Sequence, residues 1–217
     1  MRERPIVFNT EMVRSILDGR KTCTRRVIKF TNGMTGHPIG KAGDSSNPLG
    51  VMYPGGIKRP PYQPGDILYV RETFTWCPCW DCGLDTTPDG CKNPVIYDFK
   101  KKEHGCYMYR ASCEDSKYSS ADTWHPSIHM PKEAARIFLK VTDVRVERLQ
   151  KIDIEGIRNE GLSSAAVHCG DMEIALKEWE ILWNSTIKKS DLDRYGWDAN
   201  PYVWVIEFER CEKPGKE

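Results

Sequence analysis

Two segments of the chain have a period of two in their side chains. Residues 135–149 alternate apolar and polar side chains over much of their length, and in residues 202–210 Tyr202, Trp204, Ile206 and Phe208 alternate with valine and glutamate. Successive side chains of a β-strand point to opposite faces of a sheet, so this alternation predicts two long strands. In the first segment the pattern shifts by one position near Thr142 and Asp143, which predicts a β-bulge. Shorter strands are expected at residues 5–8, 24–30, 67–74 and 107–111.

Apolar residues at helical spacing predict three helices, over residues 12–17, 152–160 and 172–186. The side chains expected to cap their first turns are, in chain order, Asn9 or Thr10, Asp153 and Asp171. Gly19 and Gly161 follow the first two helices and are expected to end them in left-handed turns.

Strands outnumber helices, and the two kinds of element do not alternate along the chain, which disfavours a parallel doubly wound sheet. The order of elements predicts an α+β fold in which short helices flank a mostly antiparallel, barrel-like sheet. One domain is expected over residues 1–217, interrupted by two irregular insertions at residues 31–63 and 76–106.

The first insertion, residues 31–63, is rich in Gly and Pro and is longer than most unstructured connections. It carries aromatic and basic side chains suited to a nucleic-acid partner, namely Tyr53, Lys58, Arg59 and Tyr62. The alternative interpretation is a flexible insertion without a binding role.

The second insertion, residues 76–106, is rich in cysteine. Cys79 and Cys82 have the short spacing of a zinc knuckle, and a tetrahedral site needs four donors. The candidate zinc ligands are Cys77, Cys79, Cys82 and Cys91, with His104 and Cys106 as further donors. The alternative is a reduced, cysteine-rich insertion. No cofactor is expected for catalysis.

Composition limits the classes of function. The chain has 217 residues, 29% of them charged, and a formal net charge of +1, so no global basic field for coating nucleic acid is expected. The nine cysteines are odd in number and no export signal is visible, which favours reduced thiols and a cytoplasmic protein. No stretch is apolar enough to predict a membrane span or a membrane partner.

The most suggestive polar cluster lies at residues 19–26, between the first helix and a strand. Lys21, Thr24 and Arg26 supply an amine, a hydroxyl and a guanidinium, which suit a phosphate, a polar base or an activated nucleophile. In a strand, Thr24 and Arg26 share one face and Arg25 takes the other. The alternative for the basic residues is surface ion pairing, because acidic residues nearly balance basic ones.

Three further polar residues are candidates for ligand binding. Arg71 and Glu72 interrupt an apolar strand, where a charge pair either marks the end of the strand or lines a pocket. His129 lies in an extended segment between prolines and is interpreted as a pocket or core histidine, the core being favoured.

Motifs along most of the chain resemble the ASCH domain family, whose fold is similar to the RNA-binding β-barrel of PUA domains. The motifs that carry this resemblance are residues 19–26, 65–68, 159–161 and 202–208, and, for longer members from phages and prophages, residues 70–73, 126–131 and 196–201. The two insertions lie outside the resemblance.

One enzyme branch of that family removes the acetyl group from N4-acetylcytidine. By motif, the resemblance implies that Lys21, Thr24 and Glu160 are the catalytic base, nucleophile and proton shuttle. It also implies a pocket for a pyrimidine nucleoside, with Arg26 at a basic position of the family. This chain is about twice as long as members of that branch, which leaves the substrate open.

Three functions follow from the residues and the resemblance together. The first is binding of RNA or a modified nucleoside at a site containing Lys21, Thr24 and Glu160, with ligand contacts from Arg25, Arg26, Arg71, Glu72 and His129. The second is hydrolysis of an N4-acylated cytidine. The third is a phage regulatory or host-takeover role built on the same scaffold.

Overall fold

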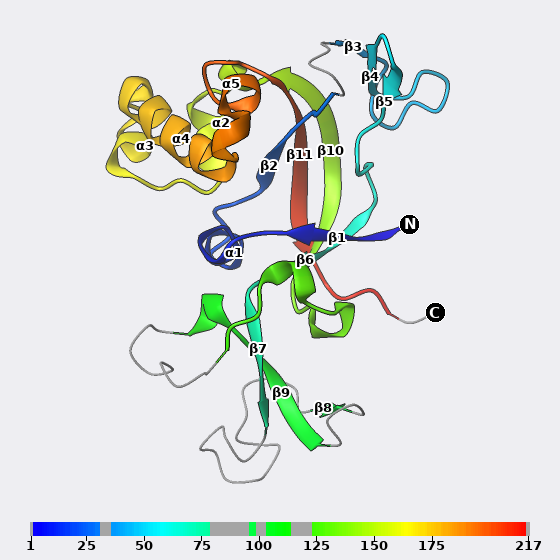
Figure 1. Cartoon of the computed structure of the whole chain (residues 1–217), viewed down its shortest axis with the longest axis vertical. Helices are drawn as coiled ribbons and strands as arrows, with labels where there is room; N and C mark the ends of the chain where they lie inside the picture. Colours follow the sequence, from blue (N-terminus) through cyan, green and yellow to red (C-terminus); the bar gives the residue numbers. More distant parts are fainter. Residues whose placement is uncertain (1, 31–35, 79–95, 99–102, 114–122, 216–217) are drawn as a thin grey trace. The chain divides into compact units, whose positions relative to one another are not determined.

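The computed structural model describes residues 2–30, 36–78, 96–98, 103–113 and 123–215 (Figure 1). Its strands are β1 (Glu3–Val7), β2 (Cys23–Val27), β3 (His37–Ile39), β4 (Gly50–Tyr53), β5 (Gly56–Lys58), β6 (Ile67–Arg71), β7 (Phe74–Pro78), β8 (Ile96–Asp98), β9 (Glu103–Tyr109), β10 (Phe138–Arg148) and β11 (Tyr202–Cys211). Its α-helices are α1 (Thr10–Leu17), α2 (Ile154–Asn159), α3 (Ala165–Cys169), α4 (Met172–Thr186) and α5 (Leu192–Tyr195).

The predicted mixture of short helices and a mostly antiparallel sheet is confirmed. The largest sheet has five strands in the order β1-β6-β10-β11-β2, and β10 and β2 both pair antiparallel with β11. The sheet does not close into a barrel within the described residues, because β1 and β2 lie at opposite ends of this order. The barrel predicted from the sequence is therefore, in this part of the chain, an open sheet.

The chain divides into two compact units. The first unit comprises Met1–Arg4, Ser15–Leu68 and Phe138–Glu217, and the second comprises Pro5–Arg14 and Tyr69–Ile137. The expectation of one domain over residues 1–217 stays a prediction.

In the first unit, β10, β11 and β2 form a platform with two buried faces. Residues opposite one another in antiparallel strands point to the same face, and Arg25 lies opposite Val205 while Thr24 lies opposite Ile206. Val203 and Val205 pack with α4 residues Trp179 and Trp183 in one core cluster. The face that carries Arg25 is therefore covered by helices. The predicted β-bulge is confirmed between Val141 and Asp143.

Side-chain caps fix the starts of the helices, as the sequence predicts. Asp153 accepts a hydrogen bond from the Gly156 backbone N–H at 2.7 Å, and Asp171 accepts one from the Ile174 N–H at 3.2 Å. Asn9 performs the same role for α1. The sequence patterns missed the two shortest α-helices, α3 and α5.

Both insertions contain strands that the sequence did not reveal. Within 31–63, strands β3, β4 and β5 form an antiparallel sheet, so the prediction of an irregular insertion is wrong for this part. Strand β8 lies within 76–106 and forms a second three-stranded sheet with β7 and β9, which extend beyond the two ends of this insertion. Strands β3, β4 and β5 have only three or four residues each. Pro38, Gly50 and Gly56 also interrupt the alternation of side chains by which strands are recognised.

Among the described residues, the structure has no helix with the length and apolar character needed to cross a bilayer.

Candidate functional site

The turn after α1 places Lys21 beside the end of α2. Gly19 adopts a left-handed conformation with φ of 75°, as predicted, and the N–H groups of Arg20 and Lys21 both bond to the Ser15 carbonyl at 2.9 and 3.0 Å. The next N–H, that of Thr22, donates to the Asn159 carbonyl at 2.9 Å. These backbone contacts hold the segment before β2 against the last turn of α2.

Gly161 permits this close approach. Its φ is 97°, and a Cβ atom there would lie 2.8 Å from Ser15 Cβ and 3.1 Å from Lys21 Cβ. Because an ordinary side chain is strained at such a φ and has no room, glycine is required immediately after Glu160. The sequence Glu160–Gly161 thus sets both the end of the helix and the contact with Lys21.

Lys21 and Glu160 form a buried ion pair. The Lys21 ammonium nitrogen lies 2.6 Å from Glu160 Oε2 and donates to the Glu160 backbone carbonyl at 3.0 Å. The Lys21 side chain is fully buried, and 3% of the Glu160 side chain is exposed. Two of the three residues that the resemblance assigns to catalysis, 139 positions apart, therefore meet.

Arg25 completes the cluster from the helix-covered face of β2. Its guanidinium reaches Glu160 Oε1 at 3.3 Å and Glu147 Oε2 at 3.6 Å. A Cβ atom on Gly156 would lie 3.0 Å from Arg25 Nη2, so glycine also makes room here. The Arg25 Nε group is buried and has no hydrogen-bond partner among the described residues. Sequence reasoning missed Glu147, because only the strand register places it beside Arg25.

Thr24 and Arg26 lie on the opposite face of β2 from Arg25, as the predicted alternation requires. Thr24 is buried, and its hydroxyl makes no hydrogen bond to Lys21 or Glu160 in the structure. Burial lowers the pKa of Arg26, while the nearby Tyr62 and Glu160 raise it. Glu160 therefore acts electrostatically on Arg26 as well as pairing with Lys21 and Arg25.

The candidates Arg71, Glu72 and His129 belong to the second unit. Glu72 is buried and accepts two hydrogen bonds of 2.9 Å from Arg136, whose guanidinium stacks over the Tyr109 ring. The partner of Glu72 is thus Arg136. His129 is exposed in a 3-10 turn, Ser127–His129, so the interpretation of it as a core residue is wrong.

The candidate zinc ligands fall largely outside the described residues. Cys79, Cys82 and Cys91 lie there, and for Cys77 and His104 only the backbone is described. In the pairing of β7 with β9, Cys77 lies opposite Cys106. Within the part of the chain that is described, no group of three or more His, Cys, Asp or Glu side chains could hold a metal ion. Structural zinc stays a prediction.

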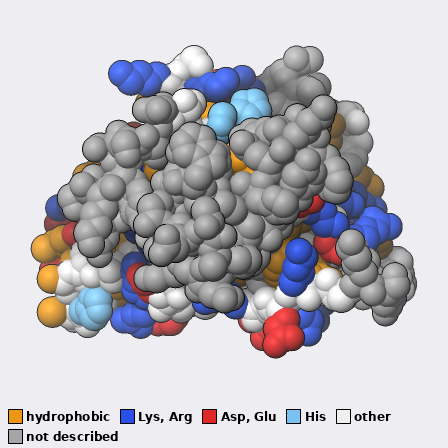
Figure 2. Space-filling model, turned by 90° about the horizontal axis from the view of Figure 1, so that it is seen from below, with side chains coloured by type: hydrophobic (Ala, Val, Ile, Leu, Met, Phe, Trp, Pro, Cys, Tyr) orange, Lys and Arg blue, Asp and Glu red, His pale blue; other side chains and the backbone are white. Residues whose placement is uncertain are grey.

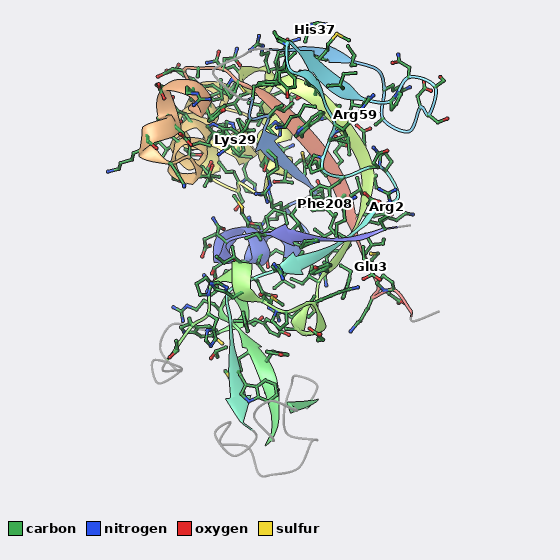
Figure 3. All side chains as sticks on the ribbon, turned by 45° about the vertical axis from the view of Figure 1, so that its right-hand side comes forward. Arg2, Glu3, Lys29, His37, Arg59 and Phe208 are labelled. Atoms are coloured by element: carbon green, nitrogen blue, oxygen red, sulfur yellow. The ribbon has the colours of Figure 1, made fainter. Side chains whose placement is uncertain are left out.

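The aromatic and basic residues of the first insertion have separate roles. Tyr53 packs against Phe30 with ring centroids 5.3 Å apart, and Lys58 is exposed. Arg59, labelled in Figure 3, donates to the backbone carbonyls of Pro48 and Leu49. Tyr62 lines a pocket together with residues of the segment 41–49.

Cys23 lies among the buried charges and gives the cluster a measurable pH signature. Burial, followed by the negative charge of Glu160, raises the pKa of the Cys23 thiol to about 12 from an ordinary value of 9.0. Above pH 9 the thiol of the unfolded chain ionises while the folded thiol keeps its proton. This contribution to stability is therefore complete below pH 9 and declines as pH rises toward 12.

We expect the free energy of unfolding of the wild type to fall by about 1 kcal/mol more than that of Cys23→Ala between pH 8 and pH 10. Urea denaturation of both proteins at the two pH values measures this difference and cancels the titration of other groups. Equal losses in the two proteins would show that Cys23 does not titrate as described.

No family model, curated protein or solved structure matches the chain. The resemblance to the ASCH family accordingly stays a prediction based on the motifs.

Proposed function

We propose that the protein binds RNA or a modified cytidine at a site with Lys21, Thr24 and Glu160, on a PUA-like scaffold of the ASCH type. The observation that carries the proposal is the buried contact of 2.6 Å between Lys21 and Glu160. Removing charged groups from water is costly, and buried charges with several partners occur often at functional sites.

The arrangement of charges around Glu160 also supports a local binding site. Lys21 and Arg25 both contact this single carboxylate, whose charge also raises the pKa of Arg26 against the larger effect of burial. Guanidinium groups suit the planar recognition of phosphates and polar bases. Figure 2 shows Lys and Arg side chains together with Asp and Glu side chains around the edge of one face. With a net charge of +1, a local site is a better basis for binding than a general electrostatic field.

Titration calorimetry of the whole protein with cytidine, N4-acetylcytidine and single-stranded RNA tests this function. We expect saturable binding of at least one of these ligands, and RNA binding that weakens as salt increases. We expect Arg26→Ala to weaken binding about tenfold through the loss of a charge-assisted contact. Lys177→Ala, which removes an exposed charge of α4, should leave binding unchanged. Absence of binding to all three ligands would overturn the proposal.

A second function, hydrolysis of an N4-acylated cytidine, is favoured by the same contact, because a proton shuttle requires Lys21 and Glu160 to touch. In this reaction Lys21 first passes its ammonium proton to Glu160 across their contact. The neutral Lys21 amine then accepts the hydroxyl proton as Thr24 Oγ forms a bond to the acyl carbon. The bond from that carbon to the exocyclic nitrogen breaks, and the amine leaves with a proton delivered by Glu160. Water then releases the acyl group from Thr24 as a carboxylic acid and restores the hydroxyl.

A further inference from the structure

A small pocket in the first unit lies where the first insertion meets the central sheet. It has a volume of about 140 Å³, and its apolar and aromatic lining includes Pro48, Leu49, Tyr62 and Val144. Lys41 and Asp44 contribute the charged groups of the lining. Pockets for whole drug-sized ligands measure about 300–1,000 Å³, so this one fits a single ring rather than a complete nucleotide.

Hydrogen bonds hold the wall formed by residues 40–49. The Asp44 carboxylate accepts hydrogen bonds from the Ser46 hydroxyl at 2.6 Å, the Asn47 N–H at 3.1 Å and the Ser46 N–H at 2.8 Å, and these bonds lower its pKa. The Lys41 N–H bonds to the Asn47 carbonyl at 2.9 Å, and the Leu49 N–H bonds to the Lys41 carbonyl at 3.1 Å. The pocket is thus preformed, which reduces the entropy lost on binding.

Hydrogen bonds also hold the part of the lining formed by residues 60–64. The N–H groups of Gln63 and Asp66 form reciprocal bonds of 3.0 Å, to the Asp66 carboxylate and the Gln63 carbonyl. The Gly65 N–H bonds to the Val141 carbonyl of β10 at 2.8 Å. These contacts attach the segment after Tyr62 to the sheet.

The strand register places the pocket on the same face of the sheet as Thr24. Val144 of β10 lies opposite Ile206 of β11, and Ile206 lies opposite Thr24 of β2. These three side chains form one row on one face, and Thr24 is two strand spacings, about 10 Å, from Val144.

We propose that this pocket binds the base of the nucleoside or nucleotide, while the rest of the ligand extends along the sheet toward Arg26 and Thr24. The inference rests on the proposed function and assigns its base-recognition site. Apolar walls with one aromatic side chain suit a flat heterocycle, and Tyr62 supplies a ring for stacking. The charged groups of Lys41 and Asp44 suit the polar edge of a pyrimidine.

The test is calorimetric titration of cytidine and N4-acetylcytidine into the wild type, Tyr62→Ala, Tyr62→Phe and Lys177→Ala. Stacking on one aromatic side chain accounts for about a 5- to 150-fold change in affinity, so Tyr62→Ala should weaken binding within that range. Tyr62→Phe keeps the ring and should bind within about threefold of the wild type. Lys177→Ala, an exposed residue of α4 outside the lining, should bind like the wild type.

The outcomes distinguish failure of the base-binding pocket from failure of the proposed binding function. Binding by the wild type that Tyr62→Ala leaves unchanged overturns the base site and leaves the proposed function standing. No nucleoside binding by the wild type, together with salt-sensitive binding of RNA, also overturns the base site, because a pocket for one base should accept a nucleoside. Equal weakening by Tyr62→Ala and Tyr62→Phe would show that the hydroxyl rather than the ring is recognised.

Discussion

Glu160→Ala is expected to lower the free energy of unfolding by about 3–5 kcal/mol. Glu160 is the carboxylate shared by Lys21 and Arg25, whose side chains are almost completely buried. Removing it leaves two cations without their main partner in a place that water does not reach, and the cost of such unpaired charges is large. Urea denaturation followed by circular dichroism measures the change.

Glu155→Ala is the matched control, since Glu155 lies on the same helix and forms an ion pair with Arg158 in which both side chains are exposed. That pair should contribute no more than about 0.5 kcal/mol. Glu160→Gln keeps the shape of the side chain and should lie between the two variants. If Glu160→Ala costs no more than Glu155→Ala, the cluster described around Glu160 is wrong.

Thr24→Val is expected to reduce hydrolysis of N4-acetylcytidine at least about 10³-fold, if the second function operates in this chain. Valine has nearly the shape of threonine, so the buried strand position should be kept while the nucleophilic oxygen is lost. Release of cytidine followed by chromatography gives the rate. The change should appear in kcat more than in KM, because the hydroxyl reacts in the transition state.

Thr22→Val supplies the control for this change. Thr22 is an exposed threonine two positions before Thr24, and its backbone rather than its side chain contacts α2. Turnover by Thr22→Val should match the wild type. Full activity in Thr24→Val would exclude Thr24 as the nucleophile, and no turnover by the wild type would leave binding as the function.

The parts of the site that depend on local chemistry were predictable from the sequence. Gly19 and Gly161 each follow an apolar helical stripe, and both adopt the left-handed conformation expected of them. Asp153 caps α2, and this fixes the position at which Glu160 leaves the helix. Alternation along β2 correctly separates Thr24 from Arg25.

The partners that depend on tertiary register were not predictable. Glu147 lies beside Arg25 because β10 and β2 flank β11, and nothing in the local sequence states which strands are neighbours. Glu72 has a charged neighbour in sequence, Arg71, yet it pairs with Arg136, 64 positions away. The partner of a buried charge is therefore set by the tertiary fold and not by the nearest opposite charge in the sequence.

The first insertion shows a second limit of sequence reasoning. A high content of Gly and Pro predicts irregular structure, but β4 buries Val51 completely and pairs with strands on both sides. Strands of three or four residues are too short for alternation to become visible. The same stretch supplies Tyr62, whose place in the pocket appears only in three dimensions.

A crystal structure of the protein with N4-acetylcytidine tests the central claim most directly. We predict that the pyrimidine ring lies against Tyr62 and Val144 and that the rest of the ligand extends over the face of the sheet that carries Thr24 and Arg26. Saturating ligand bound only elsewhere, with this face and the Lys21–Glu160 pair untouched, would contradict it.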